Sequence, residues 1–509
     1  MSSVNAYPIT LNPDQTLSDA APPLQGKRII IEANTGVGKT YYLLNTVATQ
    51  TPLVWLVPTV NQLQQLAATY GERADYVDGQ RHPETLGPVI IATYDQAPWI
   101  VEQLGAACAK YVLAIDELHQ LYQAGSYRAS ALFHLYALIE TIGEPGQFRQ
   151  LIGVSATLNP DLLYFEPDTW WTVRRAGAPT HSLRLVEYAD PNQWRRWLTE
   201  ERETFLKPDQ LHVIRLDEVE RLEELAHYFT GLGYRVLTVH SRIQDSAAVQ
   251  ERLASQVLDP SYNLLLTTSL IDEGINLMNT ALGSIHVIGA TTHLAEVRQC
   301  LDRFQAANPV VYLHVSFLAR DETSSLDLTA EGNKRLDQMA EIAALVADLL
   351  PPGSTLTQAQ RLVQKWNRFL HGLLHFEPLL LVEEAMEWTV KGNAPGLAAS
   401  LFRLEATHQY EARPTLMAAL EAQFPGCTVQ RRAVDGSDSP VATLKADLAA
   451  AQALQANTRR ALLDDSEQTL EGIVQTGVSP REAPPRGPGV RSWPSSIRSR
   501  RVGSDSLLD

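Results

Sequence analysis

The amino-acid sequence predicts an α/β protein in which two consecutive parallel sheets are followed by an α-helical domain and a disordered tail. From Gly26 to about Arg320, short apolar runs alternate with segments of helical periodicity, which is the pattern of βαβ units in parallel sheets. After Arg320 the β-branched runs give way to Leu, Ala, Glu and Gln at helical spacing, which indicates helices. The 509 residues suffice for roughly two to four domains of ordinary size.

Composition and cysteine usage exclude several classes of protein. With 45% hydrophobic and 20% charged residues, the chain is not collagen-like, fibrous or wholly disordered. Its three cysteines, Cys108, Cys300 and Cys427, lie far apart without a CxxC pair, so we expect neither a disulfide framework nor a zinc ribbon. The sequence starts without a basic segment followed by an apolar run, and no stretch approaches about 18 uninterrupted apolar residues. We therefore expect a cytoplasmic protein that does not enter a membrane.

Ten apolar runs are the predicted strands of the two sheets. In chain order they are KRIIIEA, LVWLVP, VIIAT, YVLAID, QLIGVS, LHVIRL, YRVLTV, NLLLTT, SIHVIGA and VVYLHV. After the fifth run, the segment TWWTVRRAGAPTHSLRLVEYADPNQ interrupts the alternation and predicts a connection between two sheets, with a boundary near Gly177. The predicted domains are an N-terminal extension (1–25), two sheet domains (26–177 and 178–322), a helical accessory domain (323–430) and a helix with a disordered Arg/Pro-rich tail (431–509).

Two basic clusters stand out against a formal net charge of −16, which would repel a polyanion if it were spread evenly. Six arginines and one acid lie in the tail between positions 481 and 501, which is either an aid to nonspecific nucleic-acid binding or an idle extension. In the helical domain, Arg361, Lys365 and Arg368 share one helix face, with Trp366 beside them. That face either holds phosphates while the ring stacks a base, or is a solvated face over a buried Trp366; we favour the second.

The strongest chemical signal is an eight-residue loop between the predicted strand KRIIIE and the predicted helix YYLLNTVAT. Its residues are Ala33, Asn34, Thr35, Gly36, Val37, Gly38, Lys39 and Thr40. In such a loop the glycines allow backbone N–H groups to wrap a triphosphate, Lys39 meets the β and γ phosphates, and Thr40 offers its hydroxyl to Mg²⁺. The strict pattern has Gly where this chain has Ala33. The alternative to a phosphate loop is a chance turn, which the flanking strand and helix disfavour.

Asp116 and Glu117 follow the apolar run YVLAI and therefore stand at the carboxyl end of a predicted parallel strand, where open α/β sheets bind ligands. In nucleotide hydrolysis Asp116 can hold Mg²⁺ while Glu117 polarises the attacking water. The alternative is a helix start, at which acids favour the helix dipole. Their position on a second buried strand, downstream of the phosphate loop, favours the catalytic interpretation.

Seven segments occur in a characteristic order: ANTGVGKT, LVPTVNQL, IATYDQ, DELH, GVSATL, TTSLIDEGINL and VRQCLDRF. This order resembles the motif series of superfamily 2 DExH-box (DEAD/DEAH-like) helicases and translocases. The resemblance implies two tandem RecA-like domains, with ATP and Mg²⁺ in the cleft between them and a single-stranded segment of DNA or RNA across their other faces. The implied activity is ATP hydrolysis that drives movement on nucleic acid or its unwinding.

The resemblance also implies roles for individual residues. Contacts to the nucleic-acid backbone are implied for Pro58, Thr59, Thr93, Thr268 and Asn276. Ser155 and Thr157 match the triplet that couples hydrolysis to strand movement, and Gly274 of the fifth motif is implied in nucleotide binding. His119 is either a coupling contact between the domains or a packed core histidine.

The sixth motif supplies Gln299 and Arg303, which complete the implied catalytic set with Lys39 and Glu117. An arginine finger stabilises charge on the transferred phosphoryl group only when the cleft closes. The family usually has a second arginine two or three residues further on, where this chain has Gln and Ala. Arg298 could replace it, but on a continuous helix it would point roughly 140° away from Arg303. The incomplete motif leaves an alternative function open, a nucleic-acid-dependent ATPase switch that remodels a complex without unwinding.

Overall fold

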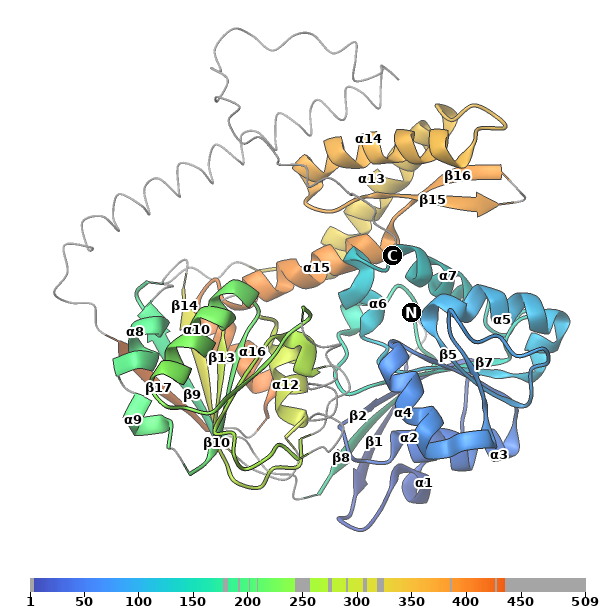
Figure 1. Ribbon diagram of the computed structural model, residues 1–509. Coiled ribbons are helices and arrows are strands. Elements are labelled where there is room, and N and C mark those ends of the chain that lie inside the picture. Colours follow the sequence, from blue (N-terminus) through green and yellow to red (C-terminus); the bar gives the residue numbers. More distant parts are fainter. Residues whose placement is uncertain are drawn as a thin grey trace, which may run out of the picture. The chain divides into compact units, whose positions relative to one another are not determined.

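The computed structural model describes residues 4–176, 182–190, 193–200, 202–207, 209–242, 257–272, 277–289, 292–304, 309–317, 325–384, 387–425 and 428–434. Within them, two parallel sheets with helices on both faces form the tandem RecA-like architecture, so the predicted fold class is confirmed (Figure 1). The tail beyond residue 434 lies outside the described residues. No helix in the described ranges is both long and apolar enough to cross a membrane.

The first sheet contains the strand that leads into the phosphate loop. Its strands are β1 (Asn5–Leu11), β2 (Arg28–Ala33), β3 (Leu53–Val57), β4 (Asp75–Val77), β5 (Val89–Thr93), β6 (Val112–Ile115), β7 (Gln150–Ser155) and β8 (Thr169–Arg175). They pair in the order β1-β8-β2-β7-β6-β3-β5-β4, and every pairing is parallel. Strand β7 therefore separates β2, which leads to the phosphate loop, from β6, which leads to Asp116. The carboxyl ends of these three strands bring the predicted motifs to one edge of the sheet.

Helices cover both faces of the first sheet because its central strands are apolar on both sides. They are α1 (Leu17–Ala20), α2 (Lys39–Tyr42), α3 (Ala48–Gln50), α4 (Val60–Tyr70), α5 (Ala97–Leu104), α6 (Gln120–Gln123) and α7 (Ala129–Glu140), with a π-helical stretch (Leu43–Val47) joining α2 to α3. On one face, Leu63 of α4 packs in a core with Trp55 of β3. On the other face, Ile100 of α5 and Leu135 of α7 pack in a second core.

The second sheet repeats this arrangement. Its strands are β9 (Ser182–Tyr188), β10 (Leu211–Leu216), β11 (Val236–Val239), β12 (Leu264–Thr267), β13 (Leu282–Ile288), β14 (Val310–Ser316) and β17 (Thr428–Val434). They pair in parallel in the order β11-β12-β10-β13-β14-β9-β17. The helices between these strands are α8 (Gln193–Glu200), α9 (Arg202–Phe205), α10 (Val219–Gly231) and α12 (Leu294–Asp302).

The residues after the second sheet form helices, as predicted, and also a hairpin that the sequence analysis did not predict. The elements are α13 (Leu328–Asp348), α14 (Leu356–Leu374), β15 (Leu379–Glu384), β16 (Glu387–Gly392), α15 (Ala394–Gln409) and α16 (Arg413–Gln423), and β15 pairs with β16 in antiparallel fashion. On α14, Trp366 is 8% exposed and packs edge-on against Phe369 at 6.3 Å, so the favoured solvated face over a buried ring is confirmed.

All ten predicted strands are present, but the sequence analysis missed strands at the edges of both sheets. The predicted N-terminal extension contains β1, which pairs with β8 and makes residues 5–11 part of the first sheet. The predicted connection contributes β8 to the first sheet and β9 to the second, on either side of the boundary expected near Gly177, which lies outside the described residues. Strand β8 alternates buried with less buried residues, and β1 buries only its last residue, Leu11, so both lack the continuous apolar run of a central strand.

A chain of buried hydrogen bonds crosses one face of the second sheet. Nδ1 of His212 lies 2.8 Å from Oγ of Ser284, which lies 2.9 Å from Nε2 of His286. Nδ1 of His286 lies 3.0 Å from Nε2 of His314, whose Nδ1 lies 2.7 Å from the hydroxyl of Tyr188. Burial lowers the pKa of His286 well below its ordinary value and that of His314 to about 3, so both rings are neutral near pH 7.

Acid should therefore destabilise the second sheet. Below the ordinary histidine pKa of about 6.5, the unfolded chain binds protons that the folded chain does not, so the free energy of unfolding falls by about 1.4 kcal/mol per pH unit for each such histidine. We predict that His314→Gln, which cannot titrate, makes this fall less steep between about pH 6 and pH 4. Urea titrations followed by near-ultraviolet circular dichroism measure the slope. The exposed His227→Gln on α10 is the control, and equal slopes for the two variants would contradict the prediction.

Candidate active site

The phosphate loop joins β2 to α2 with the backbone geometry that its glycines allow. Gly36 and Gly38 have φ values of 81° and 88°, in the left-handed region that glycine adopts without strain, and Gly38 caps the N-terminus of α2. Nζ of Lys39 donates to the backbone oxygens of Ala33 at 2.7 Å and Asn34 at 3.4 Å. The ammonium group is thus held against the backbone of the loop, where the sequence analysis expects phosphates.

Ala33 stands where the phosphate-loop pattern normally has glycine, and its place at the end of β2 explains why alanine is tolerated. Among the described residues other than glycine, positive φ occurs at Glu117 and His375, so Ala33 needs no left-handed conformation. Its side chain is fully buried and stands in register with Val173 of β8.

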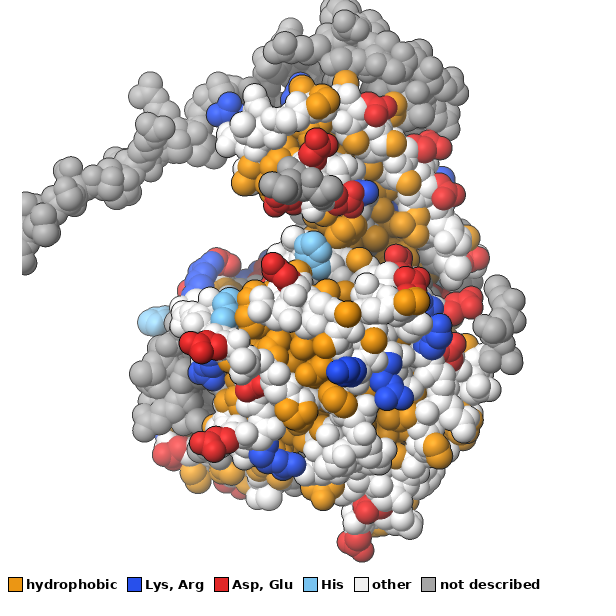
Figure 2. Space-filling view, turned by 90° about the vertical axis from the view of Figure 1, so that its right-hand side faces the viewer, with side chains coloured by type: hydrophobic (Ala, Val, Ile, Leu, Met, Phe, Trp, Pro, Cys, Tyr) orange, Lys and Arg blue, Asp and Glu red, His pale blue; other side chains and the backbone are white. Residues whose placement is uncertain are grey.

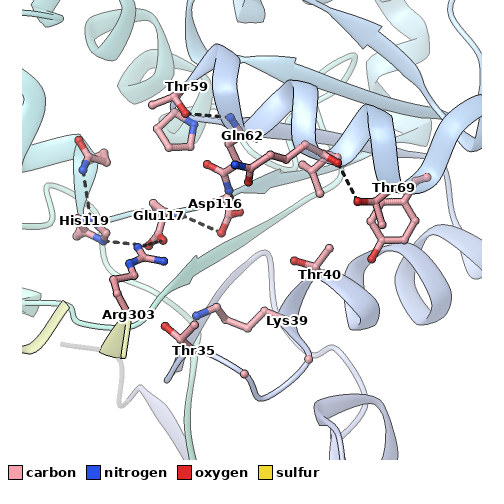
Figure 3. A pocket seen from close by; sticks show the side chains of 17 residues that line it. Thr35, Lys39, Thr40, Thr59, Gln62, Thr69, Asp116, Glu117, His119 and Arg303 are labelled. Carbon is pink, nitrogen blue, oxygen red and sulfur yellow. Dashed lines mark hydrogen bonds and ion pairs between the residues drawn. The ribbon is translucent and has the colours of Figure 1, made fainter. Parts of the chain in front are cut away.

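A pocket of about 490 Å³ lies at the phosphate loop and is drawn in Figure 3. Its lining includes Thr35, Gly36, Gly38, Lys39 and Thr40 of the loop, Asp116, Glu117 and His119 after β6, and Arg303 of the second sheet domain. Figure 3 shows Lys39 and Thr40 on one side of the pocket, with Asp116 and Glu117 across from them. The pocket therefore brings together the loop, the two acids and an arginine that is far away in the sequence.

Asp116 is buried and held by three neighbours. Its Oδ2 accepts a hydrogen bond from Nε2 of Gln62 at 2.7 Å, and its Oδ1 accepts one from the backbone N–H of Glu117 at 3.0 Å. The hydroxyl of Tyr94 donates to its backbone oxygen. Burial and the adjacent charge of Glu117 raise the pKa of Asp116 to about 7. A cation bound beside this carboxyl group would favour its charged form.

Glu117 has a strained backbone, and its side chain lies among basic side chains. Its φ of 47° is left-handed, which costs a residue other than glycine about 1–2 kcal/mol. Its Oε1 forms an ion pair with Nη2 of Arg303 at 3.5 Å. Burial by itself would raise the pKa of Glu117, but His119, Arg303 and Lys39 together lower it below its ordinary value. The carboxylate therefore stays ionised, and strain of this kind is concentrated at functional sites.

A series of buried contacts connects Glu117 with the second sheet domain. Nδ1 of His119 lies 3.4 Å from Oε2 of Glu117 and 2.8 Å from Oγ of Ser155. Oγ of Ser155 donates to the backbone oxygen of Thr157 at 2.9 Å, and Nε2 of Gln299 donates to Oγ1 of Thr157 at 2.7 Å. Because Ser155 gives its only proton to Thr157, Nδ1 of His119 must carry the proton between them. Burial lowers the pKa of His119 to about 4, so the ring is neutral near pH 7.

Two arginines of the second domain reach the first. Arg303 is the residue that ends α12, just beyond Asp302, and it pairs with Glu117 as described above. Nη2 of Arg298 donates to Oδ1 of Asn34 in the phosphate loop at 2.9 Å. The sequence analysis separated the two arginines by roughly 140° on a continuous helix, and Arg303, as the C-cap, keeps a right-handed helical backbone. Both side chains nevertheless reach the first domain.

The residues implied in nucleic-acid contact do not lie together at one place in the structure. Pro58 and Thr59 line the same pocket as the phosphate loop, and the hydroxyl of Thr59 caps α4. Thr93 and Thr268 are only 4% and 7% exposed, so their role in binding a strand stays a prediction. Gly274 and Asn276 lie outside the described residues.

Gln62 is a site residue that the sequence analysis missed. It stands three residues after Thr59 in PTVNQ, and this Thr-x-x-Gln spacing is typical of a helix capping box. The hydroxyl of Thr59 does accept from the backbone N–H of Gln62 at 3.2 Å, but the Gln62 side chain turns to Asp116 instead of back to the cap. The capping signal could have placed Gln62 on the first turn of α4, beside the carboxyl ends of the strands.

Thr40 and Asp116 have the chemistry expected of a magnesium site. Mg²⁺ prefers hard oxygen ligands, keeps several waters and commonly takes only one or two protein ligands beside substrate phosphates. The hydroxyl and the carboxyl group line one pocket. Within the described residues, no group of three or more His, Cys, Asp or Glu side chains forms a separate metal site. The donor set therefore fits a metal that is shared with phosphates.

The strained φ of Glu117 predicts an unusual order of stability for two variants. Glu117→Ala and Glu117→Gly both remove the carboxylate, but only Ala keeps the cost of a left-handed backbone. We predict that the Gly variant is more stable than the Ala variant by about 1 kcal/mol, measured by urea unfolding. The same pair of substitutions at Gln64, an exposed position of α4, is the control, and there Gly should be the less stable. A less stable Glu117→Gly would show that the backbone there is unstrained.

No family model and no curated protein sequence matches the chain. Among solved structures, it is similar to the DEAD-box helicase Mss116 bound to ssRNA and UDP-BeF, with a TM-score of 0.44 and 12% identity over 67% of this chain and 74% of that one. It is similar to S. cerevisiae Dbp5 bound to RNA and ADP BeF3, with a TM-score of 0.42 and 14% identity over 57% and 79% of the two chains. It is also similar to the DUF1998 helicase MrfA bound to DNA, with a TM-score of 0.44 and 15% identity over 74% and 56%. At these identities the similarity concerns the fold alone.

Proposed function

We propose that this chain hydrolyses ATP and couples hydrolysis to movement on, or unwinding of, a strand of DNA or RNA. The observation that carries the proposal is that Gln299 and Arg303 of the second domain meet Thr157 and Glu117 of the first beside the phosphate loop. A phosphate site whose acid and arginine come from different domains responds to movement between them. The order of the seven sequence segments supports nucleic acid as the partner.

The phosphate loop binds the substrate in this proposal. Its backbone N–H groups and the N-terminus of α2 provide positive potential for the phosphates. Burial lowers the pKa of Lys39, so a phosphate beside the ammonium group would compensate for its lost hydration. Mg²⁺, with Thr40 and Asp116 as its protein ligands, neutralises phosphate charge when it is bound. Gln62 keeps the Asp116 carboxyl group in place through its hydrogen bond.

Glu117 and Arg303 perform the two remaining tasks. The ionised Glu117 orients the attacking water and accepts its proton, and its left-handed backbone aims the carboxylate into the pocket. Arg303 is already at the pocket, paired with Glu117, and a phosphoryl group that gains charge competes for its guanidinium group. Moving the domains apart would withdraw Arg303 from this position and break the bond between Gln299 and Thr157. Hydrolysis thereby becomes linked to the distance between the domains.

The first prediction of this proposal separates binding from hydrolysis. Lys39→Ala removes a phosphate contact and should weaken ATP binding, whereas Glu117→Gln keeps the shape of the side chain and loses the base. We expect both variants to lose turnover while Glu117→Gln still binds ATP. Turnover by the full chain, measured with single-stranded and duplex DNA and RNA, and binding of a fluorescent ATP analogue provide the readouts.

Normal hydrolysis by Glu117→Gln would remove Glu117 from the catalytic role. ATPase activity that no nucleic acid stimulates would contradict DNA or RNA as the partner. Strand separation, followed on a labelled duplex with ATP, then distinguishes unwinding from movement or switching on the strand.

The second prediction compares the two arginines. Arg303→Ala should lower kcat by about 10³-fold with little change in KM, because a finger contributes mainly in the transition state. Arg298→Ala removes a hydrogen bond to Asn34, which is not a reacting group, and should have a much smaller effect on kcat. Steady-state kinetics at saturating nucleic acid measure both. If Arg298→Ala shows the larger loss of kcat, the finger is Arg298.

A further inference from the structure

Helix α15 comes from the residues after the second sheet, and its N-terminal end is pressed against the first domain. Gly125 lies in the 3-10 turn Ala124–Ser126, which follows α6 and the acidic segment of the active site. A Cβ atom at Gly125 would lie 1.8 Å from the backbone oxygen of Pro395, so only glycine permits this approach of the helix. The start of α15 is therefore held against the backbone that leads away from Glu117.

The surface between α15 and the first domain is apolar. Leu397, Leu401 and Phe402 of α15 share one buried core with Tyr122 and Leu162 of the first domain. The rings of Tyr122 and Phe402 are 5.4 Å apart. Figure 2 shows hydrophobic side chains gathered where the upper part of the molecule meets the lower part. Burial of this kind makes the contact a fixed junction, because separating it would expose the core to water.

Near the C-terminal end of α15, the carboxylate of Glu405 contacts one residue of each sheet domain. Oε2 of Glu405 accepts a hydrogen bond from Nδ2 of Asn159 at 2.7 Å and lies 3.1 Å from Nε2 of His293. Asn159 follows Thr157 by two residues in the first domain. His293 is the residue that caps the N-terminus of α12, the helix that carries Gln299 and ends at Arg303.

Several contacts hold the His293 ring in place. Its Nδ1 accepts the backbone N–H of Ala295 at 3.1 Å, and its Nε2 lies 3.1 Å from both Oε2 of Glu405 and Nε2 of Gln409. The ring also stacks on Phe402 of α15 at 4.2 Å. Oε1 of Gln409, one turn beyond Glu405, accepts the backbone N–H of Leu294 at 3.0 Å. The first turn of α12 is thus bound to α15 through its cap and its backbone.

The chain beyond α15 is anchored in the second domain. The hydroxyl of Tyr410 donates to the backbone oxygen of Thr292 at 2.7 Å. Arg413, the first residue of α16, makes a two-point ion pair with the buried Glu187 of β9 through contacts of 3.1 and 2.7 Å. Leu416 of α16 is buried in a core of the second sheet. Helix α15 is consequently fixed to the first domain at one end and to the second at the other.

We infer that α15 sets the distance between the two halves of the active site, with Glu405 as its positioning residue. The inference rests on the proposed function. Glu405 touches no substrate; it acts by holding Asn159 of the first domain and His293 of the second to a single oxygen atom. Because His293 begins the helix that ends at Arg303, the position of α15 determines how far Arg303 and Gln299 reach into the first domain. Movements of α13–α16 would thereby alter hydrolysis.

The test compares two substitutions of Glu405. Glu405→Ala removes the contacts to both Asn159 and His293, so kcat for ATP should fall by about tenfold or more, while KM, set by the phosphate loop, should stay near that of the parent. Both contacts use one oxygen of Glu405, which a Gln side chain can supply, so Glu405→Gln should keep most of the parent's kcat. Asn159→Asp, which keeps its shape and replaces the donor with an acceptor, should behave like Glu405→Ala. Glu411→Gln, at a partly exposed carboxylate just beyond α15 that pairs with His408, is the charge-matched control.

Hydrogen exchange of the full chain gives a readout that does not depend on turnover. Without nucleotide, the amides of α12 should exchange faster in Glu405→Ala than in Glu405→Gln or the parent. With a non-hydrolysable ATP analogue, the phosphate loop should be protected in every variant, and α12 should be protected less in Glu405→Ala. Equal exchange of α12 in all variants, or equal loss of kcat in Glu405→Gln and Glu405→Ala, would overturn the positioning role. A parent chain whose loop is never protected would instead reject ATP as the substrate, and exchange of α12 without nucleotide would still decide the role of Glu405.

Discussion

The ion pair between Arg303 and Glu117 is the contact on which the architecture of the site depends. It joins a carboxylate at the edge of the first sheet to an arginine at the end of a helix in the second domain, 186 residues apart in the sequence. Two hydrogen bonds accompany it, one from Gln299 to Thr157 and one from Arg298 to Asn34. The second domain therefore contacts Glu117, Thr157 and the phosphate loop at once. A change in the distance between the domains cannot affect one of these contacts alone.

The charges in the pocket show how strongly the site is biased toward a charged ligand. Burial lowers the pKa of Lys39 and raises that of Asp116, so each group is held in a place where its charged form has lost hydration. Glu117 stays ionised because cations surround it, and its backbone is kept in a left-handed conformation by the surrounding fold. Buried charges without full compensation are costly to stability. Phosphates with a divalent cation would supply the missing partners for Lys39 and Asp116.

The residues that follow β14 are part of the two-domain core and not an appendage to it. Helix α15 shares a core with Tyr122 of the first domain, α16 packs into the second, and β17 extends the second sheet beside β9. Arg298, which reaches the phosphate loop, also donates to the backbone oxygen of Gln423 at the end of α16 at 3.2 Å. Contacts from this part of the chain thus reach both sides of the pocket, which gives it a direct mechanical path to the proposed site of hydrolysis.

The sequence by itself determined the central strands, the phosphate loop, the acids after β6 and the order of the motifs. These features are local: a strand covered on both faces needs a continuous apolar run, and a loop that wraps phosphates needs glycine and lysine at set spacings. Strands at or next to the edge of the sheet, such as β1 and β8, were not predicted because partly exposed strands have weaker sequence patterns. The hairpin β15–β16 was not predicted because its two short strands lie between the long helices α14 and α15.

Only the tertiary structure decided which distant side chains meet. The Gln62 side chain turns to Asp116, Arg298 reaches Asn34, and Glu405 joins Asn159 to His293, although none of these pairs shares a local pattern. Each contact depends on how a helix packs against the rest of the chain, as the contact of Glu405 on α15 with both Asn159 and His293 shows. Periodicity specifies which face of an element is buried, but the partner across that face is chosen by packing of the whole chain.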